Sequence, residues 1–182
     1  LPKRALCWTA HFPESTNLRL LEMEVARDTD SALTLAPRCG IPIQNCIIGD
    51  RTGKIGWTLM GRLPRRVGFD GRLPTSWADG SRRWDGWLTA EEYPRVVAPT
   101  NGCLWSANNR VCGTPAYLAR GPWSADLGAR ARQIRDDLLA LPPHTATEQD
   151  LLKIQLDDRA VFLERWQQLL CGVLRSAPAS TR

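Results

Sequence analysis

The chain has 182 residues, of which 43% are hydrophobic and 24% are charged. These values are typical of a globular domain, and they exclude a collagen-like, coiled-coil or intrinsically disordered protein. The net charge of +5 comes from 24 basic and 19 acidic residues. Because acids and prolines interleave the basic residues, we interpret these as a solvated, arginine-rich surface rather than a nucleic-acid-binding tract.

The first third of the chain predicts two helices followed by a β-hairpin. Apolar residues at helical spacing predict a helix over residues 16–28, and a second, short helix over residues 30–35 ends near a proline. Residues 43–48 and 54–60 are apolar, β-prone runs. The sequence Gly49-Asp50-Arg51-Thr52-Gly53 between them is typical of a hairpin turn.

The middle of the chain predicts a long loop and one further strand. Residues 61–87 carry glycine, proline, arginine and three tryptophans, which predicts a long loop. Residues 89–94 predict one helical turn that ends at a proline, and residues 102–108 predict a third strand.

The last part of the chain predicts three helices. They cover residues 124–141, a segment that begins at Thr145 or Thr147, and residues 159–174. The order of helices, then strands with a long loop, then helices is typical of an α+β fold rather than an alternating β/α fold.

The six cysteines and the two histidines do not predict a metal site. No two cysteines have the spacing of a zinc site, and His11 and His144 lie far apart. Cys103 and Cys112 flank a predicted turn and could form a disulfide if their Cα atoms lie within about 7 Å; two free thiols are an equally weighted alternative. No stretch approaches the roughly 18–20 apolar residues of a membrane span, and residues 1–8 lack the apolar core of a signal peptide.

Two local features are candidate parts of a catalytic site. Asn108 and Asn109 follow the predicted third strand, where a side-chain amide could donate a hydrogen bond without titrating, as an oxyanion hole requires. A simple turn is the preferred reading of the residues alone, because asparagine tolerates a left-handed backbone. Residues 128–134 could direct an arginine inward from the start of a helix, but ordinary exposed arginines are again preferred.

Five segments of the chain, taken together and in order, indicate a protein family more specifically than any one of them does. They are Pro42–Trp57, Gly61–Arg66, Arg83–Trp87 with Tyr93–Pro94, Asn101–Gly102 with Ser106–Arg110, and Gly128–Ile134. In order and spacing, over residues 6–165, they resemble motifs of the penicillin acylase (penicillin amidase) family of N-terminal-nucleophile hydrolases.

The resemblance implies an αββα enzyme that hydrolyses acyl amides of penicillins, N-acyl homoserine lactones or acyl amino acids. The nucleophile of this family is an N-terminal serine freed by autoproteolysis, and its own α-amine acts as the base. Carried over to this sequence, Asn108 is the oxyanion donor and Arg130 is the supporting cation. Ile43 and Gln44 would lie near the acyl pocket.

The resemblance also implies that residues 1–182 are an internal fragment of the large chain. They form a single partial domain, with a strand and loop region at 37–110 that carries the oxyanion motif and a helical region at 124–175. Without the N-terminal serine the isolated chain is expected to be inactive, and its partners are an N-acyl amide substrate and the remaining segments of its own precursor.

Neither a nucleic-acid partner nor a membrane span is expected, and no cofactor is implied. Some family members bind calcium through an acid shortly after the asparagine motif, but Val111–Ala119 contains no acid. The family is usually exported to the periplasm or beyond. A non-catalytic binding domain derived from the same fold is the alternative function.

Overall fold

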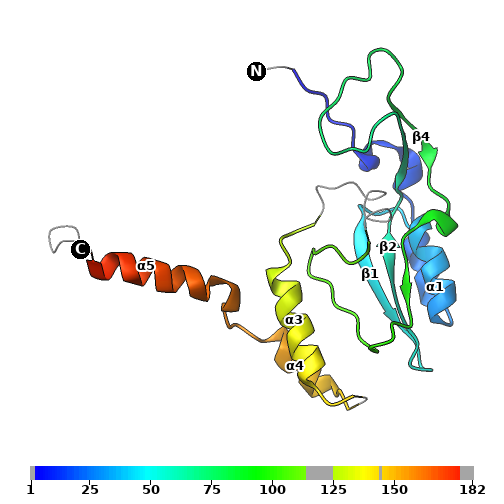
Figure 1. Ribbon diagram of the computed structural model, residues 1–182. Helices are drawn as coiled ribbons and strands as arrows, with labels where there is room; N and C mark the ends of the chain where they lie inside the picture. Colours follow the sequence, from blue (N-terminus) through cyan, green and yellow to red (C-terminus); the bar gives the residue numbers. More distant parts are fainter. Residues whose placement is uncertain (1–2, 114–124, 144, 177–182) are drawn as a thin grey trace. The chain divides into compact units, whose positions relative to one another are not determined.

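The structure is a computed structural model that describes residues 3–113, 125–143 and 145–176 (Figure 1). The chain divides into two compact units, residues 1–128 (unit 1) and residues 129–182 (unit 2), and each is described by itself. Unit 1 combines helices with antiparallel strands, which confirms the predicted α+β class, and the described part of unit 2 is helical. The single partial domain stays a prediction.

A three-stranded antiparallel sheet with the order β1-β2-β5 forms the centre of unit 1. Its strands are β1 (Gln44–Gly49), β2 (Ile55–Met60) and β5 (Val96–Val97). β1 and β2 confirm the predicted hairpin, with Cys46 opposite Thr58. β2 pairs with β1 along its whole length and with β5 at Gly56 and Trp57, and its four inner residues are buried.

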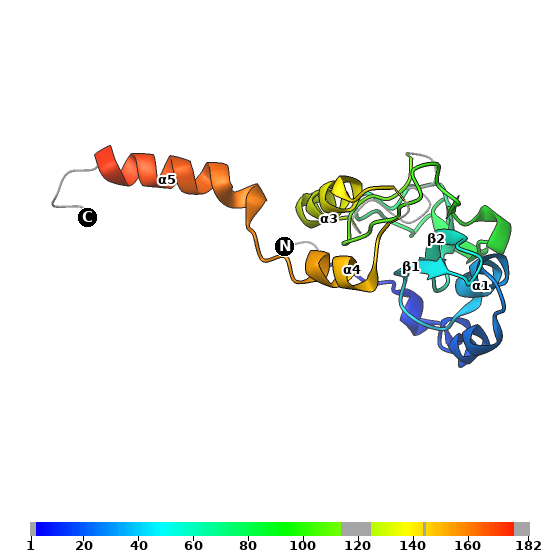
Figure 2. The ribbon, with the colours of Figure 1, turned by 90° about the horizontal axis from the view of Figure 1, so that it is seen from below.

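Helix α1 (Thr29–Leu35) lies against this sheet (Figures 1 and 2) and confirms the second predicted helix. Asp28 caps it by accepting a hydrogen bond of 2.8 Å from the backbone amide of the third helical residue. A Cβ at Gly56 would lie 2.9 Å from Cγ2 of Thr29 and 3.0 Å from Cδ1 of Leu33. Only glycine therefore lets the helix approach the strand so closely.

The Asp50 carboxylate joins the hairpin turn to the start of α1. It accepts hydrogen bonds from the backbone amides of Thr29 at 3.0 Å and Thr52 at 2.9 Å, and from the Thr52 hydroxyl. The bond from the Thr52 hydroxyl, followed by that from the Thr29 amide, holds the pKa of Asp50 well below its usual range. The turn that defines the hairpin register also fixes the helix.

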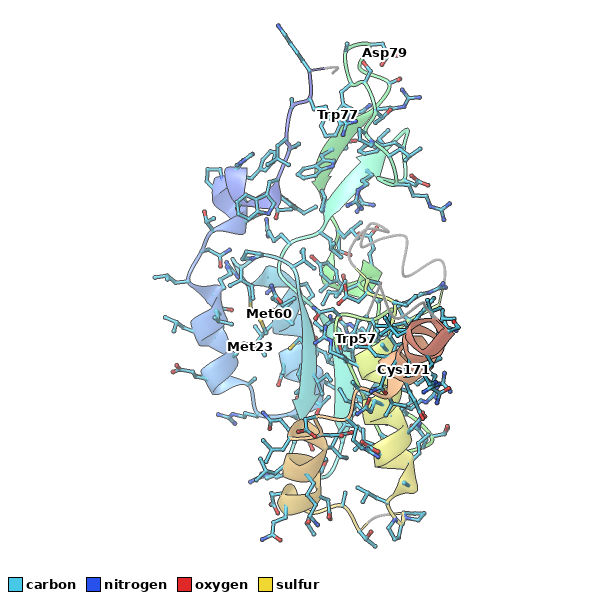
Figure 3. All side chains as sticks on the ribbon, turned by 90° about the vertical axis from the view of Figure 1, so that its left-hand side faces the viewer. Met23, Trp57, Met60, Trp77, Asp79 and Cys171 are labelled. Carbon is cyan, nitrogen blue, oxygen red and sulfur yellow. The ribbon has the colours of Figure 1, made fainter. Side chains whose placement is uncertain are left out.

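The main core of unit 1 is a cluster of four buried residues on β2 and the segments that follow it. They are Trp57, Leu59, Leu63 and Tyr93; Figure 3 labels Trp57 in this region. The Tyr93 hydroxyl donates a hydrogen bond to the carbonyl oxygen of Gly61 at 2.8 Å and accepts one from the amide of Leu63 at 2.7 Å. Burial raises the pKa of Tyr93 to about 12.

Part of the predicted long loop forms a second sheet instead. Its antiparallel strands are β3 (Pro64–Val67) and β4 (Arg83–Trp87), and the loop is limited to residues 68–82. Aromatic side chains stabilise it: neighbouring rings have centroids 5.4–6.1 Å apart in the order Phe69, Trp77, Trp84, Phe12 and Trp87. Figure 3 labels Trp77 at this end of unit 1. Since Phe12 comes from the N-terminal segment, local sequence gives no sign of this pairing.

An ion pair joins β3 to the helical turn predicted at residues 89–94, which the structure confirms as a 3₁₀ turn. Arg65 donates two hydrogen bonds of 2.7 Å to the two carboxylate oxygens of Glu92, which also accepts one from the Thr89 amide. The Arg65 guanidinium is the main reason that the pKa of Glu92 falls to about 2. Short 3₁₀ helices lie along unit 1: η1 (Thr9–His11), η2 (Pro13–Ser15), η3 (Arg19–Val25), η4 (Ala36–Arg38) and η5 (Ala90–Glu92).

Two predicted elements of unit 1 are wrong. The expected helix over residues 16–28 is the 3₁₀ helix η3, and its leucines are exposed. The Asn17 side chain accepts a hydrogen bond from the Arg19 amide and donates to two carbonyl oxygens, which competes with an α-helical start. Residues 102–108 form no strand, and the third strand of the sheet is β5 (Val96–Val97) instead.

Unit 2 contains the three predicted helices with revised bounds. They are α3 (Ala129–Ala140), α4 (Glu148–Gln155) and α5 (Glu164–Ser176), the last preceded by η7 (Val161–Leu163). Thr147 is the N-cap of α4 and forms a capping box with Asp150. Apolar side chains of α5 are about half exposed: Trp166, Leu169, Leu170, Val173 and Leu174.

All six cysteines are free thiols, so Cys103 and Cys112 form no disulfide. Within residues 3–113, 125–143 and 145–176, no helix is long and apolar enough to cross a bilayer. The same described residues contain no cluster of three or more histidine, cysteine, aspartate and glutamate side chains suited to a metal ion.

We expect Tyr93→Phe to lower the free energy of unfolding by about 1–3 kcal/mol, because the Leu63 amide and the Gly61 carbonyl would lose a buried partner. Urea denaturation measures the change. Ser81→Ala, which removes an exposed hydroxyl, should change stability by less than about 0.5 kcal/mol. Equal effects of the two substitutions would contradict the role of Tyr93.

Tyr93 also predicts a loss of stability at high pH. Its folded pKa of about 12 lies above the usual 10.0, so the folded state binds the phenolic proton more tightly. Its contribution is therefore complete below pH 10 and falls as pH rises from 10 to 12, by roughly 2–3 kcal/mol. The stability difference between the wild type and Tyr93→Phe, measured across this range, should shrink; a constant difference would refute the shift.

Candidate active site

The candidate site is built on a turn that the unit 1 core holds from both sides. Leu104 before the turn, and Val111 and Cys112 after it, pack against the buried cluster around Trp57 and Tyr93. The Asn108–Asn109 pair between them is thus anchored even though no strand precedes it. A loop carried by a rigid core is a common place for functional groups.

The backbone of Asn108 has an unusual conformation. Its φ is 61°, in the left-handed region that asparagine tolerates better than most residues. The amide of Asp126 donates a hydrogen bond of 2.6 Å to the carbonyl oxygen of Asn108, and Asn109 and Asp126 form an isolated parallel bridge. Local strain of this kind is concentrated at functional sites, and here a second segment of the chain holds it in place.

The two asparagines have different structural roles. Asn109 is 8% exposed, and its amide group shapes the turn: Oδ1 accepts a bond of 2.8 Å from the Ala107 amide, and Nδ2 donates one of 3.1 Å to the Arg110 carbonyl. The Asn108 side chain is exposed. The Asn109 side chain therefore holds the turn together. The Asn108 side chain is an amide donor, and an amide does not gain or lose a proton at ordinary pH values.

Ile43 and Gln44 lie on opposite sides of the backbone at the start of β1. Ile43 packs against the core cluster, whereas Gln44 is exposed opposite Met60 at the end of β2. This alternation follows from the two-residue period of extended chain. The next residue along β1 is Asn45, whose side-chain oxygen accepts a hydrogen bond of 3.1 Å from the Trp57 indole on β2. This bond joins the two strands of the hairpin through their side chains.

Arg130 is in the first turn of α3, and its side chain is exposed. It belongs to unit 2, and Asn108 belongs to unit 1, so each is described within its own unit. In the sequence, Arg130 follows Asp126, the backbone partner of Asn108, by four residues.

Sequence reasoning missed the partners of these residues. It did not find the Asp126 amide, the different roles of the two asparagines, or a group of polar side chains in unit 2 that contacts α3. The last could have been noticed in the charged run Asp157-Asp158-Arg159, which stands at the start of the helix predicted over residues 159–174. The stretch Val111–Ala119, which lacks the acid of calcium-binding family members, lies mostly outside the described residues.

Comparison with known proteins identifies one family in both the family models and the curated relatives. The family model for penicillin amidase matches residues 2–181. Penicillin acylase 2 proenzyme from Pseudomonas sp. (strain SE83) is 31% identical over 142 residues, 77% of this chain and 18% of that protein. Acyl-homoserine lactone acylase QuiP from Pseudomonas aeruginosa is 31% identical over 115 residues, 63% of this chain and 13% of that protein.

A solved structure shows the same fold. Thermostable penicillin G acylase from Alcaligenes faecalis matches with a TM-score of 0.62 and 22% sequence identity, over 89% of this chain and 29% of the other. This likeness confirms the fold that the motif resemblance implied. The chain spans less than a fifth of the length of the two curated relatives.

The left-handed backbone at Asn108 predicts how substitutions there affect stability. Asn108→Gly should leave the free energy of unfolding within about 0.5 kcal/mol of the wild type, and Asn108→Ala should lower it by about 1 kcal/mol, because alanine disfavours this conformation. Ala98, with φ of 45°, is the matched control, and Ala98→Gly should not destabilise the chain. Chemical denaturation would contradict the assignment if Asn108→Ala proved the more stable variant.

Proposed function

The chain belongs to the penicillin amidase family, and we propose that it supplies the oxyanion-binding part of an amidohydrolase that cleaves N-acyl amides. The observation that carries the proposal is the Asn108 turn, which presents an exposed amide from a strained backbone held by the core. The relatives are named as a penicillin acylase and an acyl-homoserine lactone acylase, which supports an acyl amide as the substrate class.

In the proposed reaction, a serine oxygen attacks the carbonyl carbon of the amide, and the carbonyl oxygen becomes an oxyanion. Asn108 Nδ2 donates a hydrogen bond to that oxyanion, which stabilises the transition state more than the ground state. The α-amine of the same serine takes the hydroxyl proton and delivers it to the leaving amine as the C–N bond breaks, and water then hydrolyses the acyl-serine ester to release the acid and restore the serine. Arg130 is the cation that supports the oxyanion region.

The nucleophile in this proposal comes from polypeptide outside residues 1–182. The short span of the chain relative to its relatives supports a partnership with further segments of a precursor. The 182-residue chain alone should then show no turnover. Because nucleophile, base and oxyanion donor are all protein groups, the mechanism requires no cofactor.

The substrate pocket and the location of the enzyme are also proposals. Gln44, exposed beside the half-buried Ile43, would make one pocket wall more polar than an aromatic acyl group favours. The family resemblance supports export to the periplasm or beyond.

The decisive experiment uses Asn108→Gly in the full-length enzyme. Glycine removes the amide donor and keeps the left-handed backbone, so lost activity reports chemistry rather than strain. We expect kcat for an N-acyl amide to fall by about 10²–10³-fold, as is typical for one oxyanion donor. The matched control is Asn101→Gly, another exposed asparagine in a turn, which should leave kcat within about twofold. Unchanged kcat in Asn108→Gly would rule out the proposed role.

A further inference from the structure

Helix α5 of unit 2 carries a continuous apolar face. The residues that follow Trp166 on this face lie three, four, seven and eight positions further along the chain, which places all of them on one side of the helix. The opposite side is polar and includes Gln168. We call the apolar residues the α5 face: Trp166, Leu169, Leu170, Val173 and Leu174.

The α5 face is open to solvent in the described structure. Trp166 is 49% exposed, Leu169 is 59% exposed and Leu170 is 58% exposed, and no described residue of α5 is buried. A single exposed leucine is ordinary on a protein surface. A continuous apolar stripe along a whole helix is different, because such stripes mark contact surfaces.

Unit 2 has almost no apolar core of its own. Among its described residues only Ala131 of α3 is buried. Leu151 and Leu152 of α4, and Leu156 at its end, are also at least half exposed. Most helices in proteins depend on packing of an apolar face rather than on intrinsic propensity. The helices of unit 2 therefore need apolar surface supplied by other polypeptide.

The lengths of the related proteins indicate where that polypeptide comes from. The chain spans 18% of penicillin acylase 2 proenzyme, 13% of acyl-homoserine lactone acylase QuiP and 29% of the penicillin G acylase chain of known structure. Most of each of these polypeptides lies outside the matched region. A segment of the same precursor would also meet the α5 face at a high effective concentration, because the two are covalently linked before processing.

A second copy of the chain is a less suitable occupant. The 13 residues of α5 form a strip roughly 20 Å long and roughly 10 Å wide, on the order of 200 Å². A specific complex between separate proteins buries about 800 Å² on each partner. The α5 face alone is too small for a stable dimer, whereas a covalently linked segment does not need so large a contact.

A membrane surface is also a less suitable occupant. Helices that lie in the membrane interface are rich in lysine and arginine on their polar side. Helix α5 contains Arg165 and Arg175 but no lysine, and Glu164 offsets one of these charges.

We propose that the α5 face is the docking surface for a segment of the enzyme precursor outside residues 1–182, and that this segment presents a complementary apolar surface. This inference rests on the proposed function, which takes residues 1–182 as part of a longer amidohydrolase. In that enzyme the partner segment covers the α5 face and supplies the apolar contacts that unit 2 lacks.

The test is photo-crosslinking in the full-length enzyme, with the photoreactive amino acid benzoylphenylalanine in place of Trp166. An aromatic group replaces an aromatic group, so the bulk of the side chain is kept. We expect mass spectrometry to identify cross-links to peptides from outside residues 1–182. Cross-links to a second copy of α5, cross-links to residues 1–128 alone, or no cross-link at all would overturn the inference.

The matched control places the same photoreactive group at Gln168, on the opposite side of α5. Its yield of cross-links to the partner segment should be at least about fivefold lower, because this side of the helix faces away from the α5 face. Equal yields from the two positions would show that the contact is not made by the α5 face. If the replacement of Trp166 prevents folding, Leu174 at the edge of the α5 face carries the group instead, with the same outcomes.

A pair of lysine substitutions in the full-length enzyme gives an independent readout. Leu170→Lys should lower the yield of soluble enzyme at least about fivefold, because it buries an ammonium group without a partner under the docked segment. Gln168→Lys, on the exposed polar side, should leave the yield within about twofold of the wild type. Equal yields of the two variants would show that the α5 face stays in water, and would overturn the inference.

Failure of this inference and failure of the proposed function give different results. If Asn108→Gly is fully active but position 166 cross-links to the precursor outside residues 1–182, the proposed function fails and the assignment of the α5 face holds. If Asn108→Gly is impaired but no such cross-link forms, only the inference about the α5 face fails.

Discussion

The hydrogen bonds of the Tyr93 hydroxyl are the constraint on which unit 1 depends. This one buried group bonds to the backbone of Gly61 and of Leu63, the first and last residues of the segment that connects β2 to β3. It therefore fixes the connection between the two sheets. Tyr93 also belongs to the cluster that Leu104, Val111 and Cys112 contact. The position of the candidate site therefore follows from the same packing that connects the sheets.

The two units are stabilised in different ways. Unit 1 buries a tryptophan, two leucines and a tyrosine in one cluster, and the strained turn is attached to it. Among the described residues of unit 2 only Ala131 of α3 is buried, and charged and amide side chains join this helix to Asp157 and Arg159. Polar contacts depend more strongly on orientation than apolar contacts do, so they restrict the rotation of a helix more sharply.

The elements that the sequence predicted correctly are those with local signals. The turn at residues 49–53 and the capping residue Thr147 each determine structure within a few positions. β3 and β4 could not be predicted, because their aromatic support includes Phe12, which lies far away in the sequence. The strand expected at residues 102–108 is absent, and β5 pairs with β2 instead; strand pairing is a tertiary choice that no local pattern reveals.

The candidate site shows the same limit. The motif resemblance selected Asn108, but only the geometry shows that Asn109 is used to build the turn. The hydrogen bonds from Gln133 to Asp157 and from Arg159 to Asp137 join residues more than 20 positions apart, so hydrophobic periodicity, the main signal in the sequence, carries no information about them.

The left-handed backbone at Asn108 has a consequence for combinatorial libraries screened by survival. Under the proposed function, most amino acids at this position would be depleted for two separate reasons, an unfavourable backbone and a missing amide. Read counts for those amino acids alone do not separate the two reasons. Glycine and aspartate are the informative codons, since both accept this conformation without offering an amide donor. Their enrichment relative to alanine would measure how much of the selection at this position acts on shape and how much on chemistry.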